Sequence, residues 1–310
     1  MGQVGRYWRL VVMLTIYACP ILAASERSPT TVRTAYHATV TAMDADGRRS
    51  YATTNFTAMA RPGDDAIGTS VDLQDRGVYG VGMPISLSFS APIPNDEKDE
   101  VVRRLSVKSD PPQTGAWRWY GDRQVIYRPE QHWRPGTMVT LNAPLGGLEV
   151  GGRHLDADRN VALTIGNKTT FWIKNETKQM EVFQNDKLVK NFPVSLGKSL
   201  TPTSSGNMVI MSKEPSAHWV YGPDEERFVK HAERLTADGE YIHGAPWSVA
   251  DQGRNNVSRG CTNLSPENAE WVYNNSQIGD PVTVIGTEKR LDPANGWTVW
   301  DMSWEDYIKR

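Results

Sequence analysis

Short segments that alternate hydrophobic and polar residues recur along most of this 310-residue chain. Between residues 69 and 166 they follow one another roughly every 8–12 residues, separated by turns rich in glycine and proline. This spacing predicts an immunoglobulin-like antiparallel β-sandwich over residues 69–166. The strands expected there cover residues 85–89, 105–107, 117–120, 125–127, 138–141 and 161–165.

Residues 167–288 are predicted to form a second β-rich domain with few helices. Residues 169–173 and 179–184 alternate around a polar turn and predict a hairpin. A helix is expected over residues 266–276, because Ser265 can cap its first turn and proline is tolerated at its first position. The other elements expected here are strands over residues 187–196, 208–211 and 280–286 and a helix over residues 224–237.

Two shorter patterns flank these domains. Residues 25–68 contain a hairpin signature around residues 44–47 but too few strands for a sandwich, so we predict a partial β segment. Residues 289–310 form a tail whose aromatic residues would share one helical face. We expect that face to pack on the second domain, with a sugar- or partner-binding platform as the alternative. The aromatic residues are Trp297, Trp300, Trp304 and Tyr307.

Residues 1–24 have the pattern of an export leader. Two arginines precede a mostly apolar run over residues 10–24 that ends in small residues. The run is shorter than the roughly 18–20 residues that a comfortable membrane span needs. We therefore expect an exported protein of the periplasm or cell wall, whose leader is cleaved, lipidated at Cys19 or retained as a membrane tether.

The charge balance gives no support for nucleic-acid binding. The chain has 34 lysines and arginines against 36 acidic residues, a formal net charge of −2, and contains no basic run. Nucleic acid requires a basic face. The spacing of the six histidines indicates no metal site, and no cofactor is expected.

The candidate chemistry centres on Cys261, one of two cysteines and the only one outside the leader. A lone thiol in an exported chain is an inert buried residue, an intermolecular link or a nucleophile. The surrounding residues 258–263 are polar and include a glycine, which is poor sequence for a hydrophobic core. The nucleophile is therefore favoured.

A nucleophilic thiol needs a base, because a free cysteine with a pKa near 8.5 is mostly protonated at neutral pH. His243 is the candidate, able to accept the proton and return it to a leaving amine. Residues 244–257 are rich in turn formers, so the chain can bring Cys261 back beside His243. Gly260 permits a conformation that would aim its amide and that of Cys261 at one oxyanion.

The run from His243 through Ser258, Gly260 and Cys261 to Asn263 resembles the signature of the L,D-transpeptidases of bacterial cell walls, with their YkuD-type catalytic domain. The preceding sandwich and the tryptophan-rich tail are similar to the mycobacterial and actinobacterial branch. The resemblance covers residues 35–310. It implies a mainly β chain in which an immunoglobulin-like β-sandwich is followed by a β-rich L,D-transpeptidase catalytic domain with few helices.

The resemblance also implies a reaction on peptidoglycan stem peptides. Cys261 would attack the diaminopimelate carbonyl of a donor tetrapeptide, release D-alanine, and pass the acyl group to an acceptor stem as a 3→3 cross-link. His243 would be the base and acid, oriented by the carbonyl of Gly244, and carbapenems would acylate Cys261. The residues that would line or cover the cleft are Ser258, Arg259, Asn263, Trp247, Asp238, Gly239 and, in a lid over residues 211–238, Trp219 and Tyr221.

Arg259 departs from this family pattern, in which histidine is common. Arginine cannot shuttle protons at neutral pH, but it can lower the thiol pKa, hold a stem carboxylate, or point into solvent. Two alternatives to the transpeptidase stay open. An L,D-carboxypeptidase would use water as acceptor with the same catalytic residues, and a non-catalytic wall-binding protein would account for Arg259.

Overall fold

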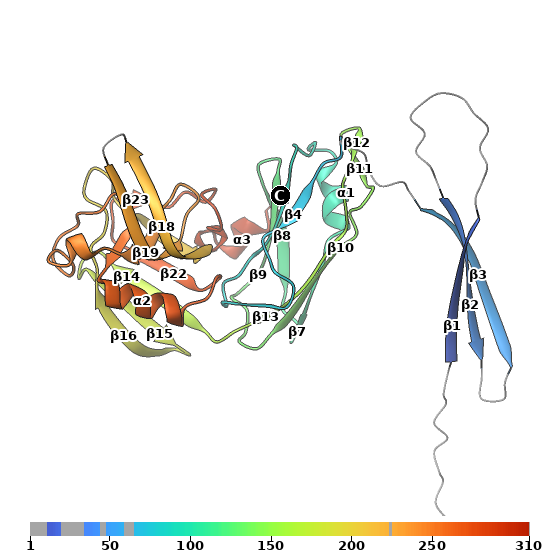
Figure 1. The fold of residues 1–310 in the computed structure, drawn as a ribbon, viewed down its shortest axis with the longest axis horizontal. Coiled ribbons are helices and arrows are strands. Elements are labelled where there is room, and N and C mark those ends of the chain that lie inside the picture. The colour runs from blue at the N-terminus through green and yellow to red at the C-terminus, as the bar shows by residue number, and fades with distance from the viewer. Residues whose placement is uncertain (1–10, 20–33, 44–47, 59–64, 223–224, 310) are drawn as a thin grey trace, which may run out of the picture.

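The computed structural model describes residues 11–19, 34–43, 48–58, 65–222 and 225–309. Figure 1 shows two neighbouring β-domains and, apart from them, a small sheet near the N-terminus. The predicted mainly β fold is confirmed. Most of the predicted leader and the turn expected at residues 44–47 lie outside the described residues.

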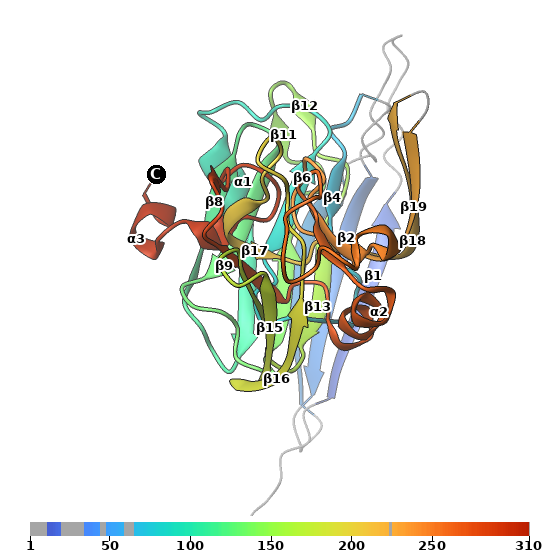
Figure 2. The ribbon, with the colours of Figure 1, turned by 90° about the vertical axis from the view of Figure 1, so that its left-hand side faces the viewer.

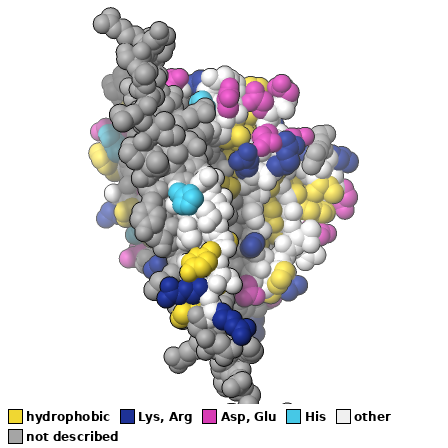
Figure 3. Space-filling view, turned by 90° about the vertical axis from the view of Figure 1, so that its right-hand side faces the viewer, with side chains coloured by type: hydrophobic (Ala, Val, Ile, Leu, Met, Phe, Trp, Pro, Cys, Tyr) yellow, Lys and Arg dark blue, Asp and Glu magenta, His cyan; other side chains and the backbone are white. Residues whose placement is uncertain are grey.

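The N-terminal sheet contains β1 (Val11–Cys19), β2 (Thr34–Met43) and β3 (Arg49–Ala58), in that order. Antiparallel pairing of β2 with β3 confirms the hairpin predicted within residues 25–68. Figure 3 views the molecule from the side of this sheet and shows acidic and basic side chains interspersed beside it. Among the described residues no helix is long and apolar enough to cross a membrane. The fate of the leader stays a prediction.

The sandwich consists of two four-stranded sheets. One sheet contains β4 (Thr69–Val71), β6 (Ile85–Phe89), β9 (Gln124–Pro129) and β8 (Gly115–Tyr120), in that order. The other contains β5 (Gly77–Tyr79), β13 (Arg159–Ile165), β10 (Met138–Ala143) and β7 (Ser106–Asp110). All six predicted strands are confirmed. Short elements outside the prediction are β4 and β5 together with α1 (Lys98–Arg103), β11 (Glu149–Val150) and β12 (Arg153–His154).

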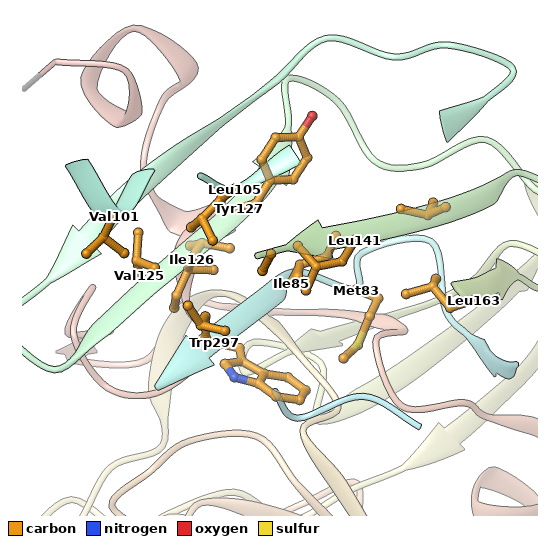
Figure 4. Close-up of a cluster of buried hydrophobic side chains, with 14 of the residues drawn as sticks. Met83, Ile85, Val101, Leu105, Val125, Ile126, Tyr127, Leu141, Leu163 and Trp297 are labelled. Carbon is orange, nitrogen blue, oxygen red and sulfur yellow. The ribbon is translucent and has the colours of Figure 1, made fainter. Parts of the chain in front are cut away.

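Part of the core of this domain follows from strict alternation of buried and exposed side chains along β10. In β10, Val139, Leu141 and Ala143 are buried, while the residues between them are exposed. Side chains at alternate positions point to one face of a strand, so the apolar set meets the facing sheet. Figure 4 shows Leu141 among other side chains of this core, together with Trp297 from the C-terminal tail.

The second domain packs two sheets around a separate core. The larger sheet contains, in order, β16 (Lys187–Pro193), β15 (Gln179–Gln184), β14 (Thr169–Lys174), β22 (Pro281–Ile285), β17 (Ser204–Val209) and β23 (Lys289–Arg290). The smaller contains β18 (Ser212–Gly222), β19 (Glu225–Arg234), β20 (Tyr241–Gly244) and β21 (Thr262–Leu264). Pairing of β14 with β15 confirms the predicted hairpin.

Helix α2 (Pro266–Asn275) confirms the helix predicted after the cysteine motif. Ser265 accepts a hydrogen bond from the amide of Asn268, which caps the first turn as expected. The helix buries Ala269 and Val272 in the second core, which also holds Ile242 and Leu264 of the strands that carry the motif.

The helix predicted over residues 224–237 is wrong, because the chain there forms strand β19 paired with β18. The segment is rich in Glu, Arg, Lys and Ala, which favour helix locally. Cross-strand contacts override that preference. The His218 ring of β18 stacks on Phe228 at 4.2 Å between centroids, and its Nε2 lies 2.8 Å from Glu226.

The tail is also different from the prediction. It forms two short pieces, η2 (Val299–Asp301) and α3 (Trp304–Tyr307), instead of one helical face, and its aromatic side chains pack in the sandwich core, which Val209 of the second domain also reaches. The Arg128 guanidinium of β9 attracts them, and the Tyr307 hydroxyl donates to Ile126 O at 2.7 Å. Figure 2 shows α3 beside β8 and β9. The ring centroids lie 4.7 Å (Trp300), 5.3 Å (Trp304) and 4.4 Å (Tyr307) from the guanidinium.

Candidate active site

His243 and Cys261 lie on neighbouring parallel strands. β20 carries His243, and β21 begins one residue after Cys261. In their register His243 is opposite Asn263, and Ile242 is opposite Thr262. Because side chains alternate along a strand, His243, Cys261 and Asn263 share one face, whereas Ile242 points into the core. The strand pairing therefore brings the predicted thiol and imidazole to the same side of the sheet.

The loop between β20 and β21 pairs with residues that come shortly after the end of β16. It contains η1 (Pro246–Ser248) and several turns, then forms a bridge between Gly197 and Ser258. This return encloses a cavity of about 270 Å³. The side chains that line it are Lys198, Arg227, His243, Trp247, Val257, Ser258, Arg259, Cys261 and Asn263.

The imidazole of His243 is held in one orientation. Its Nδ1 lies 3.0 Å from the carbonyl oxygen of Gly244, so Nδ1–H donates and Nε2 is left as the basic nitrogen. Trp219 of β18 packs edge-on against the ring at 5.0 Å, and Trp247 lies at 6.0 Å. Burial lowers the pKa of His243 to about 4, although the Gly244 carbonyl favours the charged form. At neutral pH the imidazole is therefore an uncharged base.

Cys261 is a free, half-buried thiol. Burial raises its pKa to about 12, and the nearby Glu240 and Asp238 charges act in the same direction. The sulfur lies 3.8 Å from the carbonyl oxygen of Gly239. The resting site therefore pairs a neutral thiol with a neutral imidazole rather than a thiolate with an imidazolium.

The residues before Cys261 form a compact turn. The Ser258 hydroxyl donates to the carbonyl of Cys261 at 2.5 Å and accepts from the amide of Gly260 at 3.1 Å. Gly260 has φ +124°, a conformation that a side chain would strain. The glycine is thus required as predicted, but its amide serves the turn and is not aimed at an oxyanion. The amide of Cys261 is the remaining donor of the predicted pair.

The other predicted residues divide into those that line the cavity, those that do not, and one whose side chain is not described. Trp247, Ser258, Arg259 and Asn263 line the cavity, and the Asn263 amide is fixed by donating to Ser248 Oγ at 3.0 Å. Asp238 and Gly239 are not among the lining residues. Asp238 instead accepts from Thr236 at 2.5 Å and lies 3.6 Å from Lys289. Tyr221 belongs to β18, but its side chain is not described.

The sequence did not point to three further lining residues, namely Lys198, Arg227 and Val257. Lys198 and Arg227 lie on segments far along the chain from the cysteine motif, so only the folded sheet brings them to the cavity. Among the described residues no group of histidine, cysteine and acidic side chains could hold a metal ion.

Fold and site together define a cysteine-nucleophile site in a β-domain that follows an immunoglobulin-like sandwich. Family models agree with this class: residues 25–149 match a bacterial Ig domain, and residues 168–284 match the L,D-transpeptidase catalytic domain. The first match begins before the observed sandwich and ends inside it, so the predicted domain boundaries stay predictions.

Known relatives are similar over most of the chain. L,D-transpeptidase 2 of Mycobacterium tuberculosis is 32% identical, over 75% of this chain and 59% of that protein. L,D-transpeptidase 5 of the same organism is 31% identical, over 99% of this chain and 71% of its own length. The chain belongs to the L,D-transpeptidase family, which confirms the resemblance. Its match spans less than two thirds of the first of these relatives.

Solved structures show the same fold. The LD transpeptidase LdtMt1, in complex with imipenem, superimposes with a TM-score of 0.60 at 28% identity, covering 71% of this chain and 99% of that one. L,D-transpeptidase 3 from Mycobacterium tuberculosis has a TM-score of 0.58 at 31% identity, with the same coverage.

Proposed function

We propose that this chain is a peptidoglycan L,D-transpeptidase that forms 3→3 cross-links between diaminopimelate residues through a thioester on Cys261. The observation that carries the proposal is the placement of Cys261 and a tautomer-fixed His243 in one cavity. Membership of the family supports the same chemistry. The substrates would be a donor tetrapeptide stem and an acceptor stem.

In the proposed reaction each proton passes through His243, whose Nε2 is the basic nitrogen. His243 Nε2 takes the proton from Cys261 as the sulfur attacks the diaminopimelate carbonyl, so no thiolate has to be stored beforehand. Collapse of the tetrahedral intermediate breaks the bond to D-alanine, and the imidazolium returns its proton to the leaving amine. The acceptor's side-chain amine then attacks the thioester. It loses a proton to His243, and the thiol is regenerated.

The test is incubation of the purified protein with a synthetic tetrapeptide, followed by mass spectrometry of the products. Cross-linked dimers with release of D-alanine are expected from the wild type, and neither product from Cys261→Ala. Tripeptide without dimers would instead identify an L,D-carboxypeptidase. No turnover by either protein would leave the non-catalytic wall-binding protein as the better description.

Carbapenems should act on the same residue. LdtMt1, which shares this fold, has been solved in complex with imipenem. We expect imipenem or meropenem to acylate Cys261, because the thiol would open the β-lactam ring as it attacks the stem carbonyl. Intact-mass measurement should show one adduct on the wild type and none on Cys261→Ala.

The place of action follows from the substrate. Peptidoglycan lies outside the cytoplasmic membrane, and the pattern of residues 1–24 is that of an export leader. We propose a location in the periplasm or cell wall, with the leader cleaved, lipidated at Cys19 or retained as a tether. Mass analysis of the mature protein from membranes would separate these three fates.

A further inference from the structure

Glu240 is a buried carboxylate beside the candidate active site, although it does not line the cavity. Its side chain accepts hydrogen bonds from the Ser204 amide at 3.0 Å, from the Ser204 hydroxyl at 2.7 Å and from Lys289 Nζ at 2.8 Å. Ser204 begins β17 and Lys289 begins β23, and these two residues pair with each other. Charge-assisted hydrogen bonds of this kind are short and strong. They tie the Glu240 side chain to the edge of the six-stranded sheet.

The backbone on both sides of Glu240 contacts the sulfur of Cys261. The thiol donates to the carbonyl oxygen of Gly239, with the sulfur 3.8 Å away, and the backbone of Tyr241 makes a further hydrogen bond to the sulfur. The Glu240 side chain also lies against Gly260, because a Cβ built on that glycine would be 3.6 Å from Glu240 Cγ. The anchored carboxylate therefore connects the sheet edge to the groups that contact the nucleophile.

Residues 235–240 form a turn between β19 and β20 and belong to no helix or strand. Gly239 in this turn has φ +103°, a conformation that favours glycine. The Glu240 amide donates to Thr236 Oγ1 at 2.9 Å, and the Glu240 carbonyl accepts from the Leu235 amide at 2.8 Å. These backbone bonds stay within the turn, whereas the bonds of the Glu240 side chain connect the turn to the neighbouring sheet.

We propose that Glu240 is a positioning residue for acyl transfer: its bonds to Ser204 and Lys289 hold residues 239–241 against Cys261 and so place the sulfur for attack. This inference rests on the proposed function, because it concerns the nucleophile of that reaction. Glu240 acts through the backbone, since its side chain does not line the cavity. A misplacement of about 1 Å can cost roughly a hundredfold in rate, so loosening the turn should lower kcat.

The first experiment measures kcat and KM for D-alanine release from the tetrapeptide, per folded molecule as determined by circular dichroism. Glu240→Gln keeps the shape of the side chain but removes its charge, and should lower kcat about tenfold, the size of one charge-assisted contact. Glu240→Ala removes the whole anchor and should lower kcat about a hundredfold. KM should stay within about twofold of the wild-type value in both variants, because the substrate does not contact this side chain.

Glu233→Gln is the matched control. Glu233 is also a buried glutamate of the second domain with a serine and a lysine beside it, but these are Ser276 and Lys213. This variant should keep the wild-type kcat and KM. Ser204→Ala removes one hydrogen bond to Glu240 and should lower kcat less than Glu240→Ala does. The double variant should be no slower than Glu240→Ala alone, because both changes remove the same contact.

A second measurement needs no peptide. Burial raises the pKa of Cys261, and the charges of Glu240 and Asp238 raise it further. Iodoacetamide, a neutral reagent, reacts with the thiolate, so the pH of half-maximal labelling should fall in Glu240→Gln and stay unchanged in Glu233→Gln. Lys289, which lies beside both Glu240 and Asp238, is retained in these variants. Labelling is read from the peptide that contains Cys261, and a single kinetic phase confirms that only folded molecules are measured.

Several results would overturn the positioning role while leaving the proposed function standing. They are a wild-type kcat in Glu240→Ala, a change in KM alone, additive losses in the double variant, and a labelling midpoint that Glu240→Gln leaves unchanged. Absence of turnover by the wild type would instead count against the proposed function. The labelling midpoint would then decide by itself whether Glu240 acts on the thiol.

Discussion

The protonation states of Cys261 and His243 set how the site can work. With the thiol pKa raised to about 12 and the imidazole pKa lowered to about 4, both groups are neutral over the whole physiological range. In the proposed reaction, proton transfer then accompanies attack on the carbonyl, and the rate depends on the neutral imidazole. Such general-base assistance typically raises the reaction rate by a factor of roughly 10²–10⁴.

We therefore predict a single-turnover acylation rate that is flat from about pH 5 to pH 9 and falls tenfold per unit below about pH 4, where the imidazole is protonated. Trp219→Ala should move this acidic limb upward toward the ordinary histidine pKa, because removing the ring lets water reach His243. Phe228→Ala, on an exposed position of the same hairpin, should leave the limb in place. If the wild-type acylation rate instead rises with an apparent pKa near 8, the reaction requires a thiolate already formed in the resting site.

At the scale of single residues, the sequence predicted those parts of the site that lie close together in the chain. The thiol, the imidazole and the glycine follow from a motif carried by two adjacent strands, and that spacing already implies their proximity. Lys198 and Arg227 could not be found in the same way. Lys198 approaches Cys261 only through the bridges that residues 195–197 make with the cysteine segment, and Arg227 only through the β18–β19 hairpin. The role of the Gly260 amide was also missed, since it depends on the Ser258 side chain.

The β18–β19 hairpin contains a buried carboxyl group, that of Glu233, near its open end. Glu233 is fully buried and accepts from Ser276, with Lys213 at 3.9 Å. Burial raises the pKa of Glu233 to about 7, and burial likewise raises the pKa of Asp280 beside it. Among the described residues Glu233 Oε2 has no hydrogen-bond partner, so a charge there is poorly compensated.

A raised carboxyl pKa means that the folded state binds a proton that the unfolded state has released. The contribution of Glu233 to stability is therefore greatest below about pH 4.5 and is lost as the pH rises to about 7, at about 1.4 kcal/mol per unit. We predict that Glu233→Gln flattens the decline in melting temperature over that window. Glu226→Gln, at an exposed site of the same strand, should follow the wild type. A wild-type melting temperature that rises from pH 5 to pH 7 while the variant stays level would contradict this.

At the scale of elements, prediction succeeded wherever alternation and capping agreed with the tertiary pairing. β10 and α2 are such cases. It failed for β19, whose composition favours helix and whose strand conformation is imposed by β18. The prediction for the tail failed for a related reason. The aromatic spacing suggested one helical face, but the tail conformation depends on contacts with Arg128, about 170 residues earlier in the chain.

Over the whole molecule the tail joins the two domains. Trp300 Nε1 donates to Gly82 O of the sandwich domain at 2.7 Å, whereas Asp301 accepts from the Asn207 amide of the second domain at 2.8 Å. Trp297 lies in the core of the sandwich domain together with Val209 of β17. The two cores are thus linked through residues 297–307, and we expect them to unfold in one transition.

Tyr307 is the residue on which this link can be tested, since it is 1% exposed and bonded to Ile126. Tyr307→Ala leaves a cavity and removes the hydrogen bond to Ile126, and should lower the free energy of unfolding by about 3–5 kcal/mol. Calorimetry should then show the sandwich domain melting before the second domain, while labelling of Cys261 by iodoacetamide at low temperature is unchanged because that site rests on the other core. Ile308→Ala, 49% exposed at the next position, is the control and should change little. If Tyr307→Ala still melts in one transition at the wild-type temperature, the tail does not couple the domains.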